Sequence, residues 1–397
     1  MRIALIADTF PPLRNSGAVQ LRDLVREFVR QGHSVTVLLP HPDLQESWRL
    51  ELFDGAQVLR LKAPRTKDVG YLERTLGEVL LPFVMKYQLK KSPFPKERWD
   101  GVVWYSPSIF LGPLANTLKK ASGCKSYLII RDIFPEWAVD MGLMGGRGLP
   151  YRFFDAIARY QYSVADIIGV QTSGNKKYFE LWHQKPGNQL EVLQNWLGKP
   201  TQVHCSIRVD ETHLAGRKVF VYAGNMGVAQ GMDIVLDLAE KLLDRSDVGF
   251  LFVGRGSDAV RLKNTAQLRK LSNVILYDDI PPEEILDLYA QCNAGIVALD
   301  PRHKSHNIPG KFLTYMQSGL PVLANVNFGN DLASIIRTAR VGQVCESNCV
   351  NELVDLANKV LDQIECDNEL AERCTRLFHQ EFSVEKAVRQ IVKALAR

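Results

Sequence analysis

Two glycine-rich turns in the second half of the chain could bind a phosphate group. The turn at 224–231 follows an apolar run and carries Asn225 and Gln230, and the turn at 254–256 places Arg255 between two glycines. A glycine at a strand end lets backbone N–H groups approach an anion, and a guanidinium can donate paired hydrogen bonds to phosphate. Two such turns after consecutive strands indicate an anionic ligand more strongly than either turn alone.

A helix start provides a third candidate. Pro309 and Gly310 precede an apolar helical pattern, and Lys311 falls in its first turn. The first N–H groups of a helix lack backbone partners and carry partial positive charge, so this end favours a diphosphate. An ordinary capped helix with a solvated lysine is the competing interpretation. The donor-binding positions that we assign in this half are Gly224, Asn225, Gln230, Gly254, Arg255, Ile280, Pro309, Gly310, Lys311, Phe312 and Thr314.

Two segments of the first half could complete the site. Ser16 and Gly17 lie between the first apolar run and a helix, and no G-x-G-x-x-G pattern occurs there, which argues against a nicotinamide or flavin. Arg131, Asp132 and Glu136 follow another apolar run, where they suit sugar hydroxyls or acid–base chemistry. A plain turn glycine and a salt-bridged loop are the respective alternatives. Catalytic roles are assigned to Asp132, Arg131, Glu136, Lys311 and Arg255, and no residue is assigned to a metal.

The elements that must position these residues alternate along the whole chain. Short apolar strands separated by amphipathic helices predict an α/β fold with parallel sheets covered on both faces. The strands are expected at 3–7, 35–39, 58–61, 101–105, 127–130 and 167–170, and then at 219–223, 248–253, 274–277, 295–299 and 321–324. Ligands of such sheets bind beyond the carboxyl ends of the strands.

We therefore expect two Rossmann-like, doubly wound domains that face a central cleft. The predicted divisions are an N-terminal domain over 1–197, a linker over 198–217, a C-terminal domain over 218–378 and a terminal helical segment over 379–397.

Composition limits the class of protein. The 397 residues are 46% hydrophobic and 23% charged, and no apolar run is long enough to span a bilayer. Seven scattered cysteines suggest reduced thiols, and a net charge of +5 is too small to indicate a nucleic-acid partner. With no signal-peptide pattern at the N-terminus, the expected location is the cytoplasm.

Taken together, these segments resemble the retaining GT-B-fold glycosyltransferases of family 4. Within that family they look like the branch that builds bacterial O-antigen and capsule, which includes N-acetyl-L-fucosamine transferases. The resemblance covers nearly the whole chain and rests on the order and spacing of the segments near 17, 131–136, 170–173, 192–196, 223–231, 253–256 and 310–322.

The resemblance implies an activity and a set of roles. A sugar, most often an N-acetyl amino sugar, would leave a UDP-sugar with retention of configuration, without a metal or other cofactor. Ser16 and Gly17 would approach the donor diphosphate from the acceptor-side N-terminal domain, and Lys311 would hold it from the C-terminal donor-side domain. The terminal helix would pack back toward the N-terminal domain. Arg131 stands where the family usually has a histidine that contacts the donor sugar.

Other positions also depart from the family pattern. Asn225 and Gln230 replace an Arg and a Lys, as is common in the fucosamine-transferase-like branch, so Arg255, Lys311 and Arg14 remain to neutralise the leaving diphosphate.

A second departure concerns a Glu-x7-Glu motif. His306 and Thr314 occupy the positions of its two glutamates, the second of which usually binds the donor ribose. Thr314 could still accept a hydrogen bond, but without a charge.

The acceptor is inferred from 71–99. Its apolar stripe consists of Leu76, Val79, Leu80, Phe83, Val84 and Tyr87, and its basic residues are Lys86, Lys90, Lys91, Lys96 and Arg98. A basic amphipathic segment can lie on an anionic bilayer, but a core-facing helix with a solvated basic end fits equally well. The first interpretation predicts a polyprenyl-diphosphate-linked saccharide acceptor and a peripheral contact of 76–98 with the cytoplasmic face of the inner membrane.

Three alternatives to this function stay open. An enzyme similar to UDP-N-acetylglucosamine 2-epimerase would convert the donor without an acceptor. A transferase with a soluble acceptor would not need the basic segment, and a non-catalytic nucleotide-sugar-binding protein would bind UDP without transfer.

Overall fold

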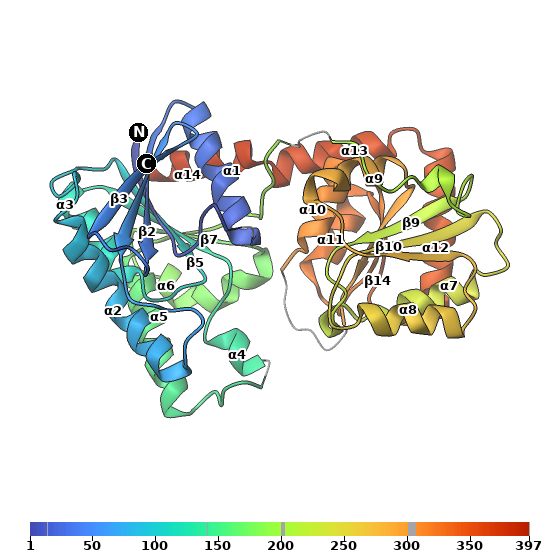
Figure 1. The fold of residues 1–397 in the computed structure, drawn as a ribbon, viewed down its shortest axis with the longest axis horizontal. Helices are drawn as coiled ribbons and strands as arrows, with labels where there is room; N and C mark the ends of the chain where they lie inside the picture. The colour runs from blue at the N-terminus through green and yellow to red at the C-terminus, as the bar shows by residue number, and fades with distance from the viewer. Residues whose placement is uncertain (14, 141, 200–202, 301–306, 397) are drawn as a thin grey trace. The chain divides into compact units, whose positions relative to one another are not determined.

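The chain forms two compact units, each built around its own sheet (Figure 1). The computed structural model describes residues 1–13, 15–140, 142–199, 203–300 and 307–396. Unit 1 consists of Met1–Gly198 together with Val384–Arg397, and unit 2 consists of Lys199–Ser383.

Unit 1 contains an eight-stranded sheet in the order β3-β4-β2-β1-β5-β6-β7-β8. Only β3 runs antiparallel to its neighbour, so parallel strands joined by helical crossovers make up the rest. The strands are β1 (Arg2–Ile6), β2 (Ser34–His41), β3 (Trp48–Phe53), β4 (Ala56–Lys62), β5 (Gly101–Ser106), β6 (Lys125–Ile130), β7 (Ile167–Val170) and β8 (Gln189–Val192). The helical segments are α1 (Ser16–Arg30), α2 (Tyr71–Leu89), α3 (Gly112–Ser122), α4 (Glu136–Asp140), α5 (Leu149–Val164), η1 (Ser173–Phe179), α6 (Glu180–His183) and α14 (Val384–Ala396).

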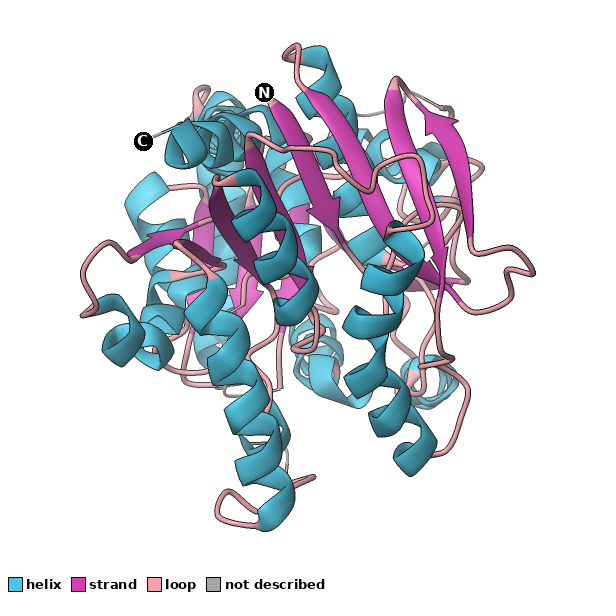
Figure 2. Ribbon diagram, turned by 90° about the vertical axis from the view of Figure 1, so that its left-hand side faces the viewer, coloured by secondary structure: helices cyan, strands magenta, loops and turns pink. Residues whose placement is uncertain are grey.

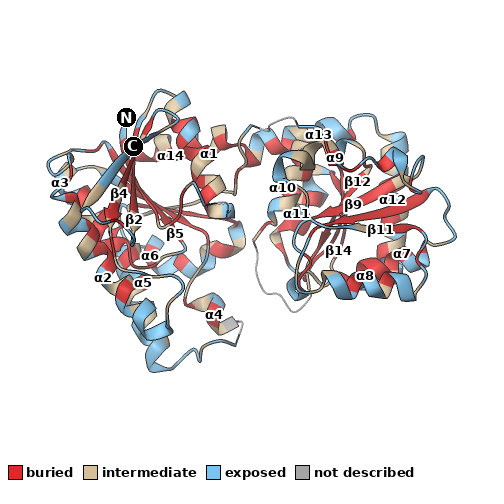
Figure 3. Ribbon diagram, viewed as in Figure 1, coloured by how far each residue is buried: buried red, intermediate tan, exposed pale blue. Residues whose placement is uncertain are grey.

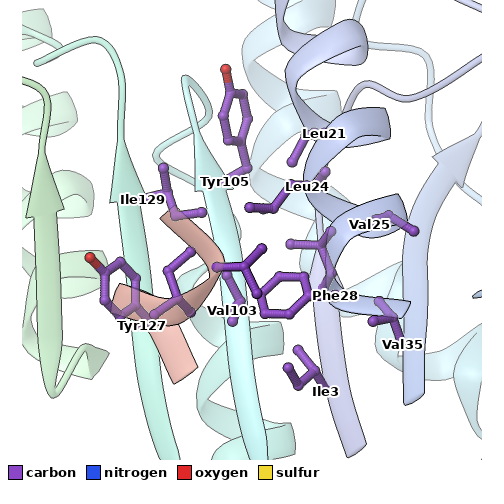
Figure 4. Packing of buried hydrophobic residues seen from close by; sticks show 14 of the residues in the cluster. Ile3, Leu21, Leu24, Val25, Phe28, Val35, Val103, Tyr105, Tyr127 and Ile129 are labelled. Carbon is purple, nitrogen blue, oxygen red and sulfur yellow. The ribbon is translucent and has the colours of Figure 1, made fainter. Parts of the chain in front are cut away.

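Helices cover both faces of this sheet (Figure 2). Alternate residues of each strand point to opposite faces, so Ile3 and Leu5 pack against α1 and α14, whereas Ala4 and Ile6 face the layer that contains α2 and α3. Figure 4 shows the first layer, in which apolar side chains of α1 lie against those of β1, β2, β5 and β6.

The last helix of the chain belongs to this core. Val388 and Ile391 of α14 are fully buried in the same cluster as Leu24 and Phe28 of α1. The backbone N–H of Val384 donates to the carbonyl of Leu197, which fixes the point where the chain re-enters unit 1. The terminal residues are thus a structural part of unit 1.

Unit 2 has a six-stranded, wholly parallel sheet in the order β11-β10-β9-β12-β13-β14. Its strands are β9 (Lys218–Ala223), β10 (Val248–Val253), β11 (Val274–Tyr277), β12 (Ala294–Ala298), β13 (Val322–Asn325) and β14 (Gly342–Cys345). Its helical segments are η2 (Val209–Glu211), η3 (Val228–Gln230), α7 (Asp233–Lys241), α8 (Ala259–Leu268), η4 (Pro282–Glu284), α9 (Ile285–Ala290), α10 (Gly310–Gln317), α11 (Asp331–Ala339), α12 (Val350–Cys366), α13 (Leu370–Leu377) and η5 (Phe378–Phe382).

The expected α/β fold with two doubly wound sheets is confirmed, and each predicted strand lies within a residue or two of an observed one. The sequence did not reveal β3, β8 and β14, which lie at sheet edges. Residues 203–217, expected to belong to a linker, instead pack on unit 2. Leu214 is 1% exposed, and the N–H of Cys205 donates to Asp287 at 2.8 Å. Apolar residues spaced among polar ones in this segment provide the packing.

Candidate functional site

The strand order of unit 2 reverses between β9 and β12. The chain proceeds outward from β9 through β10 to β11 and then returns to the other side of β9 with β12. Connections leave in opposite directions at such a point, so a crevice forms beyond the strand ends. Gly224 follows β9 directly, and the connection after β12 leads to α10. The predicted turn at Gly224 and the predicted helix start therefore flank the same switch point.

Tyr315 fixes α10 over this switch point. Its hydroxyl lies 3.0 Å from the carbonyl oxygen of Val221 in β9 and 3.1 Å from that of Ile296 in β12. Its ring occupies the space above Gly295, where a Cβ atom would come within 2.5 Å. Lys311 lies one turn earlier, at i−4, and therefore on the same side of the helix as Tyr315.

Lys311 is held by Tyr222 at the end of β9. The ammonium nitrogen donates to the Tyr222 hydroxyl at 2.8 Å and lies 4.0 Å from the centre of its ring. The hydroxyl in turn donates to the carbonyl of Asn225 at 2.5 Å. The Lys311 side chain also runs over Gly224, where a Cβ would lie 3.6 Å from its Cε. Burial lowers the pKa of Lys311 to about 7. No carboxylate is recorded as an ion-pair partner of this lysine in the described part of the chain.

The two glycine turns of unit 2 pack on each other. A Cβ on Gly254, whose φ is +150°, would lie 1.9 Å from the carbonyl oxygen of Gly224. Asn225 donates to the side-chain oxygen of Gln230 at 3.1 Å, and the N–H of Gly227 donates to the same oxygen at 3.0 Å. Glycine at 254 is thus required by close backbone approach, and Asn225 and Gln230 stabilise the turn that follows β9.

We call Tyr222, Gly224, Gly254 and the first turn of α10 with Lys311 the donor region. The cap residue Pro309 has no side-chain hydrogen bond to the first turn of α10, so its side chain does not satisfy the N–H groups there. Of these groups, the N–H of Phe312 donates to the Pro309 carbonyl at 3.0 Å. Backbone donors at a helix start and a nearby cation can together bind an anionic ligand.

Other predicted donor-binding residues lie differently. Phe312 is fully buried, and its ring lies 5.8 Å from that of Phe382. Its side chain is therefore part of the core and does not reach the exposed side of α10. Thr314 directs its hydroxyl to the carbonyl of Gly310 at 3.4 Å. Ile280 is half-buried and follows β11, at the edge of the sheet farthest from β14.

Arg255 extends into solvent. Its side chain is 83% exposed and lies 3.5 Å from the carboxylate of Asp279. His306 and Arg14 lie outside the described residues.

In unit 1, the predicted glycine turn forms the start of α1. Asn15 caps the helix by accepting from the N–H of Ala18 at 2.8 Å, and Ser16 is exposed in the first turn. Gly17 lies close above Tyr105, since a Cβ would approach its hydroxyl to 3.4 Å. The cap occupies one N–H group of this helix end and leaves the neighbouring backbone close to solvent.

Arg131 is buried behind this turn. Its side chain is 5% exposed, and its guanidinium carbon lies 4.5 Å from the centre of the Trp196 ring. One nitrogen donates to the carbonyl of Leu193 at 3.1 Å, while Nε and Nη2 have no hydrogen-bond partner among the described residues. Burial lowers the pKa of Arg131. The Arg131 side chain is enclosed in unit 1. It therefore cannot make the predicted contact with a sugar in the described structure.

Asp132, in contrast, lines a cavity of about 360 Å³ within unit 1, which we call the unit 1 cavity. Its charged lining comes from three chain segments: Asp8 after β1, Arg74 and Glu78 on α2, and Asp132 after β6. Its apolar lining includes Tyr71, Ile109, Phe110, Phe134, Trp137, Leu143 and Phe154. Carboxylates beside aromatic rings are suited to hydroxyl groups and apolar faces of a sugar.

Burial raises the pKa values of all three cavity carboxyls, Asp8, Glu78 and Asp132. The charges of Lys67 and Arg74 partly offset this for Asp8. Glu78 has a direct partner, since Arg74 donates to it at 3.0 Å. The Oδ1 atom of Asp8 is buried without a hydrogen-bond partner among the described residues.

Glu136 does not join this lining. It begins α4, and its charge contributes, after burial, to raising the pKa values of Tyr151 and Tyr162 on α5. The structure therefore brings together Asp132 and the overlooked Asp8, while Glu136 lies toward α5. Asp8 directly follows the first apolar strand, and this position was the signal that could have identified it.

The apolar stripe of α2 faces outward. Leu76 is 61% exposed, Leu80 44%, Phe83 56% and Tyr87 58%, while Leu81 and Met85 face the core (Figure 3). Most of the stripe is therefore not a core face, although its member Val79 packs against the buried cluster of Ile109, Phe110 and Ala158. None of the described helices is both long and apolar enough to cross a membrane.

Residues 217–363 match the family described as glycosyl transferases group 1. The chain is 23% identical over 371 residues to the probable glycosyltransferase WbjE of Pseudomonas aeruginosa, covering 91% of this chain and 90% of that protein. It is 24% identical over 383 residues to the putative colanic acid biosynthesis glycosyl transferase WcaI of Escherichia coli K12, covering 87% and 86%.

A solved structure with the same fold is the UDP-forming α,α-trehalose-phosphate synthase of Burkholderia xenovorans, in complex with glucose 6-phosphate. It matches with a TM-score of 0.69 at 13% identity over 100% of both chains. The chain thus has the GT-B fold, and the segment 217–363 that matches the group 1 glycosyl transferase family contains the donor region.

Proposed function

We propose that this protein is a retaining, metal-independent glycosyltransferase that uses a UDP-sugar. An N-acetyl amino sugar such as N-acetyl-L-fucosamine is the expected group to be transferred. The acceptor is a polyprenyl-diphosphate-linked saccharide of bacterial O-antigen or capsule synthesis. The similarity to WbjE and WcaI supports this class of reaction, since both are named as glycosyltransferases.

The observation that carries the proposal is the position of Lys311. Its ammonium group lies over Gly224 at the switch point of unit 2 and hydrogen-bonds to Tyr222. A diphosphate placed here would meet this cation and the first N–H groups of α10, whose partial positive charge favours it. As the bond to the sugar breaks, negative charge increases on the leaving diphosphate, so fixed positive charge stabilises the transition state more than the ground state.

We further propose that the unit 1 cavity receives the acceptor. Asp132 would accept a hydrogen bond from an acceptor hydroxyl, and Trp137 would offer a face for a sugar ring. Arg131 would be a positioning residue, because it joins β6 to the segment after β8 and stacks on Trp196, whose ring N–H donates to Gln20 of α1 at 2.8 Å.

The exposed face of α2 is proposed to contact the membrane that holds the acceptor lipid. Leu76, Leu80 and Phe83 expose large apolar groups, while the exposed Lys90 and Lys91 carry positive charge at the helix end. Apolar insertion and attraction to anionic lipid act together in such segments.

The experiment that tests the proposed function has a binding step and a product step. Nucleoside diphosphates and nucleotide sugars are each tested for thermal stabilisation of the protein, since a ligand of the folded state raises the melting temperature. The stabilising donor is then incubated with a lipid-linked acceptor, with and without EDTA, and NMR of the product gives its anomeric configuration. Conversion of the donor without acceptor would indicate an epimerase instead, and UDP binding without any conversion would indicate a binding protein.

A further inference from the structure

The unit 1 cavity has an uneven charge. Three carboxyl groups line it, those of Asp8, Glu78 and Asp132, against one guanidinium, that of Arg74. Arg74 is already paired with Glu78 at 3.0 Å. Asp8, after β1, and Asp132, after β6, therefore have no ion-pair partner among the residues that line the cavity. The positive charges of Lys67 and Arg131, which lie outside the lining, act on Asp8 and Asp132 respectively.

Asp8 carries the stronger signal of the two. Its Oδ1 atom is buried without a hydrogen-bond partner in the described part of the chain, and the residue lines the cavity wall. A buried carboxylate oxygen without a donor is costly, and a ligand that brings an O–H or N–H group would remove this cost. Burial also raises the pKa of Asp8.

We propose that the unit 1 cavity selects an uncharged sugar residue of the acceptor, that Asp8 accepts a hydrogen bond from one of its hydroxyl groups, and that acidic sugars are excluded. The inference rests on the proposed function for the identity of this ligand as the acceptor. It adds that the acceptor's diphosphate must bind elsewhere, because three carboxyl groups line the cavity against one guanidinium.

The remaining lining agrees with a single sugar ring. The volume of about 360 Å³ is at the lower end of the range for small-molecule sites. The ring of Phe154 packs edge to face against Phe134 at 5.1 Å and against Phe110 at 6.4 Å between ring centres, and the three rings form an apolar wall. Such a wall suits the C–H face of a sugar and offers no partner for a carboxylate.

The test compares two glycosides of similar size that differ in charge. Binding of methyl N-acetyl-β-D-glucosaminide and of methyl β-D-glucuronide to the full chain is measured by NMR titration. We expect the neutral glycoside to bind and the glucuronide to bind at least about tenfold more weakly, because of like-charge repulsion. Asp8→Asn should weaken binding of the neutral glycoside by about tenfold, because the hydroxyl then donates to a neutral acceptor in place of a charged one.

Two further variants make the test specific. Asp132→Asn removes another carboxyl group of the lining and should reduce the difference in affinity between the two glycosides. This keeps the test decisive if Asp8→Asn does not fold. Glu73→Gln makes the same change of charge at an exposed position of α2 outside the cavity lining and should change neither affinity.

The inference is overturned if the glucuronide binds as tightly as the neutral glycoside, if no glycoside binds, or if both cavity variants behave like Glu73→Gln. UDP binding is measured in the same samples. UDP binding without the expected sugar selectivity refutes this inference alone, whereas sugar selectivity without binding of any nucleotide refutes the proposed function and leaves the cavity assigned to a neutral sugar.

Discussion

The donor region of unit 2 is built mainly from backbone, whereas the unit 1 cavity is built from side chains. In the donor region, Gly224 and Gly254 let two strand ends approach each other, and the Lys311 side chain runs over Gly224. The cavity instead needs carboxyls from the ends of two strands and from α2, with aromatic rings between them. Diphosphates are common to many donors and acceptor sugars differ, so a backbone site suits the shared group and a side-chain site suits the variable one.

The largest effect is expected at Lys311, the cation that the structure places in the donor region. Lys311→Ala should lower turnover by about 10² to 10³, the usual loss when one preorganised charge-stabilising group is removed. The fold should persist, because the ammonium group is not part of a hydrophobic cluster. Steady-state rates measure the turnover, and circular dichroism measures the fold. The control is Lys359→Ala, at an exposed position of α12. Full activity of Lys311→Ala would refute the assignment of the donor region.

A second change tests whether the backbone of the donor region is as constrained as the geometry indicates. Gly254→Ala would place a Cβ 1.9 Å from the Gly224 carbonyl at a φ of +150°. We expect a loss of about 3 kcal/mol in the free energy of unfolding, in the range of strained backbone positions.

The matched control is Gly187→Ala in unit 1, where φ is +86° and nothing lies within 4 Å. This variant should lose about 1 kcal/mol, from backbone strain alone. Equal losses in chemical denaturation would show that the close approach of the two glycine turns does not constrain the donor region.

The charge of Lys311 should make nucleotide binding depend on pH. Burial lowers its pKa to about 7, and a bound diphosphate would favour the protonated form. Above pH 7 the free protein must therefore take up a proton on binding, and the Kd of UDP should rise by up to about tenfold per pH unit. Calorimetry in buffers of different ionisation enthalpy measures the proton uptake. In Lys311→Ala the uptake should vanish, and a pH-independent Kd in the unmodified protein would contradict this account.

Two carboxyl groups test the assignment of the acceptor to the unit 1 cavity. The sequence assigns Asp132 and Glu136 the same catalytic role, but only Asp132 lines the cavity. Asp132→Asn should raise the acceptor KM about fivefold, because a hydrogen bond to a charged group is weakened. Glu136→Gln should leave KM unchanged, since Glu136 lies outside the cavity lining and toward α5. The acceptor KM of each variant is compared with that of the unmodified protein. A larger effect of Glu136→Gln than of Asp132→Asn would contradict the assignment of the acceptor to the unit 1 cavity.

The same contrast explains how far the sequence could predict the site. Gly224, Gly254 and the start of α10 were predictable because each feature is local, so a glycine or proline after an apolar run defines it. Asp8 had a local signal that was not used, its position directly after the first apolar strand. Tyr222 was missed because its role depends on a contact between segments far apart in the chain. Tyr222 meets a lysine 89 positions away.

The other differences between the sequence prediction and the structure depend on which residues are buried. The strand pattern predicted nearly all of both sheets because parallel strands are apolar throughout, whereas the edge strand β3, with exposed Leu52, lacks that signal. For Phe312 and Arg131, residue type indicated a binding role, but both side chains are enclosed. The direction of a side chain relative to its element depends on register, which the sequence alone does not fix.

Arg255 provides the smallest and most discriminating test of the donor region. The sequence places it with Lys311 as a cation for the diphosphate, but the structure leaves its side chain 83% exposed and 3.5 Å from Asp279. A solvated charge contributes little to binding because water screens it. Arg255→Ala should therefore weaken UDP binding by no more than about threefold at moderate salt, and by less at high salt. A loss as large as that of Lys311→Ala would mean that Arg255 turns onto the ligand when the donor binds, and the donor region would then include a mobile side chain as well as a fixed one.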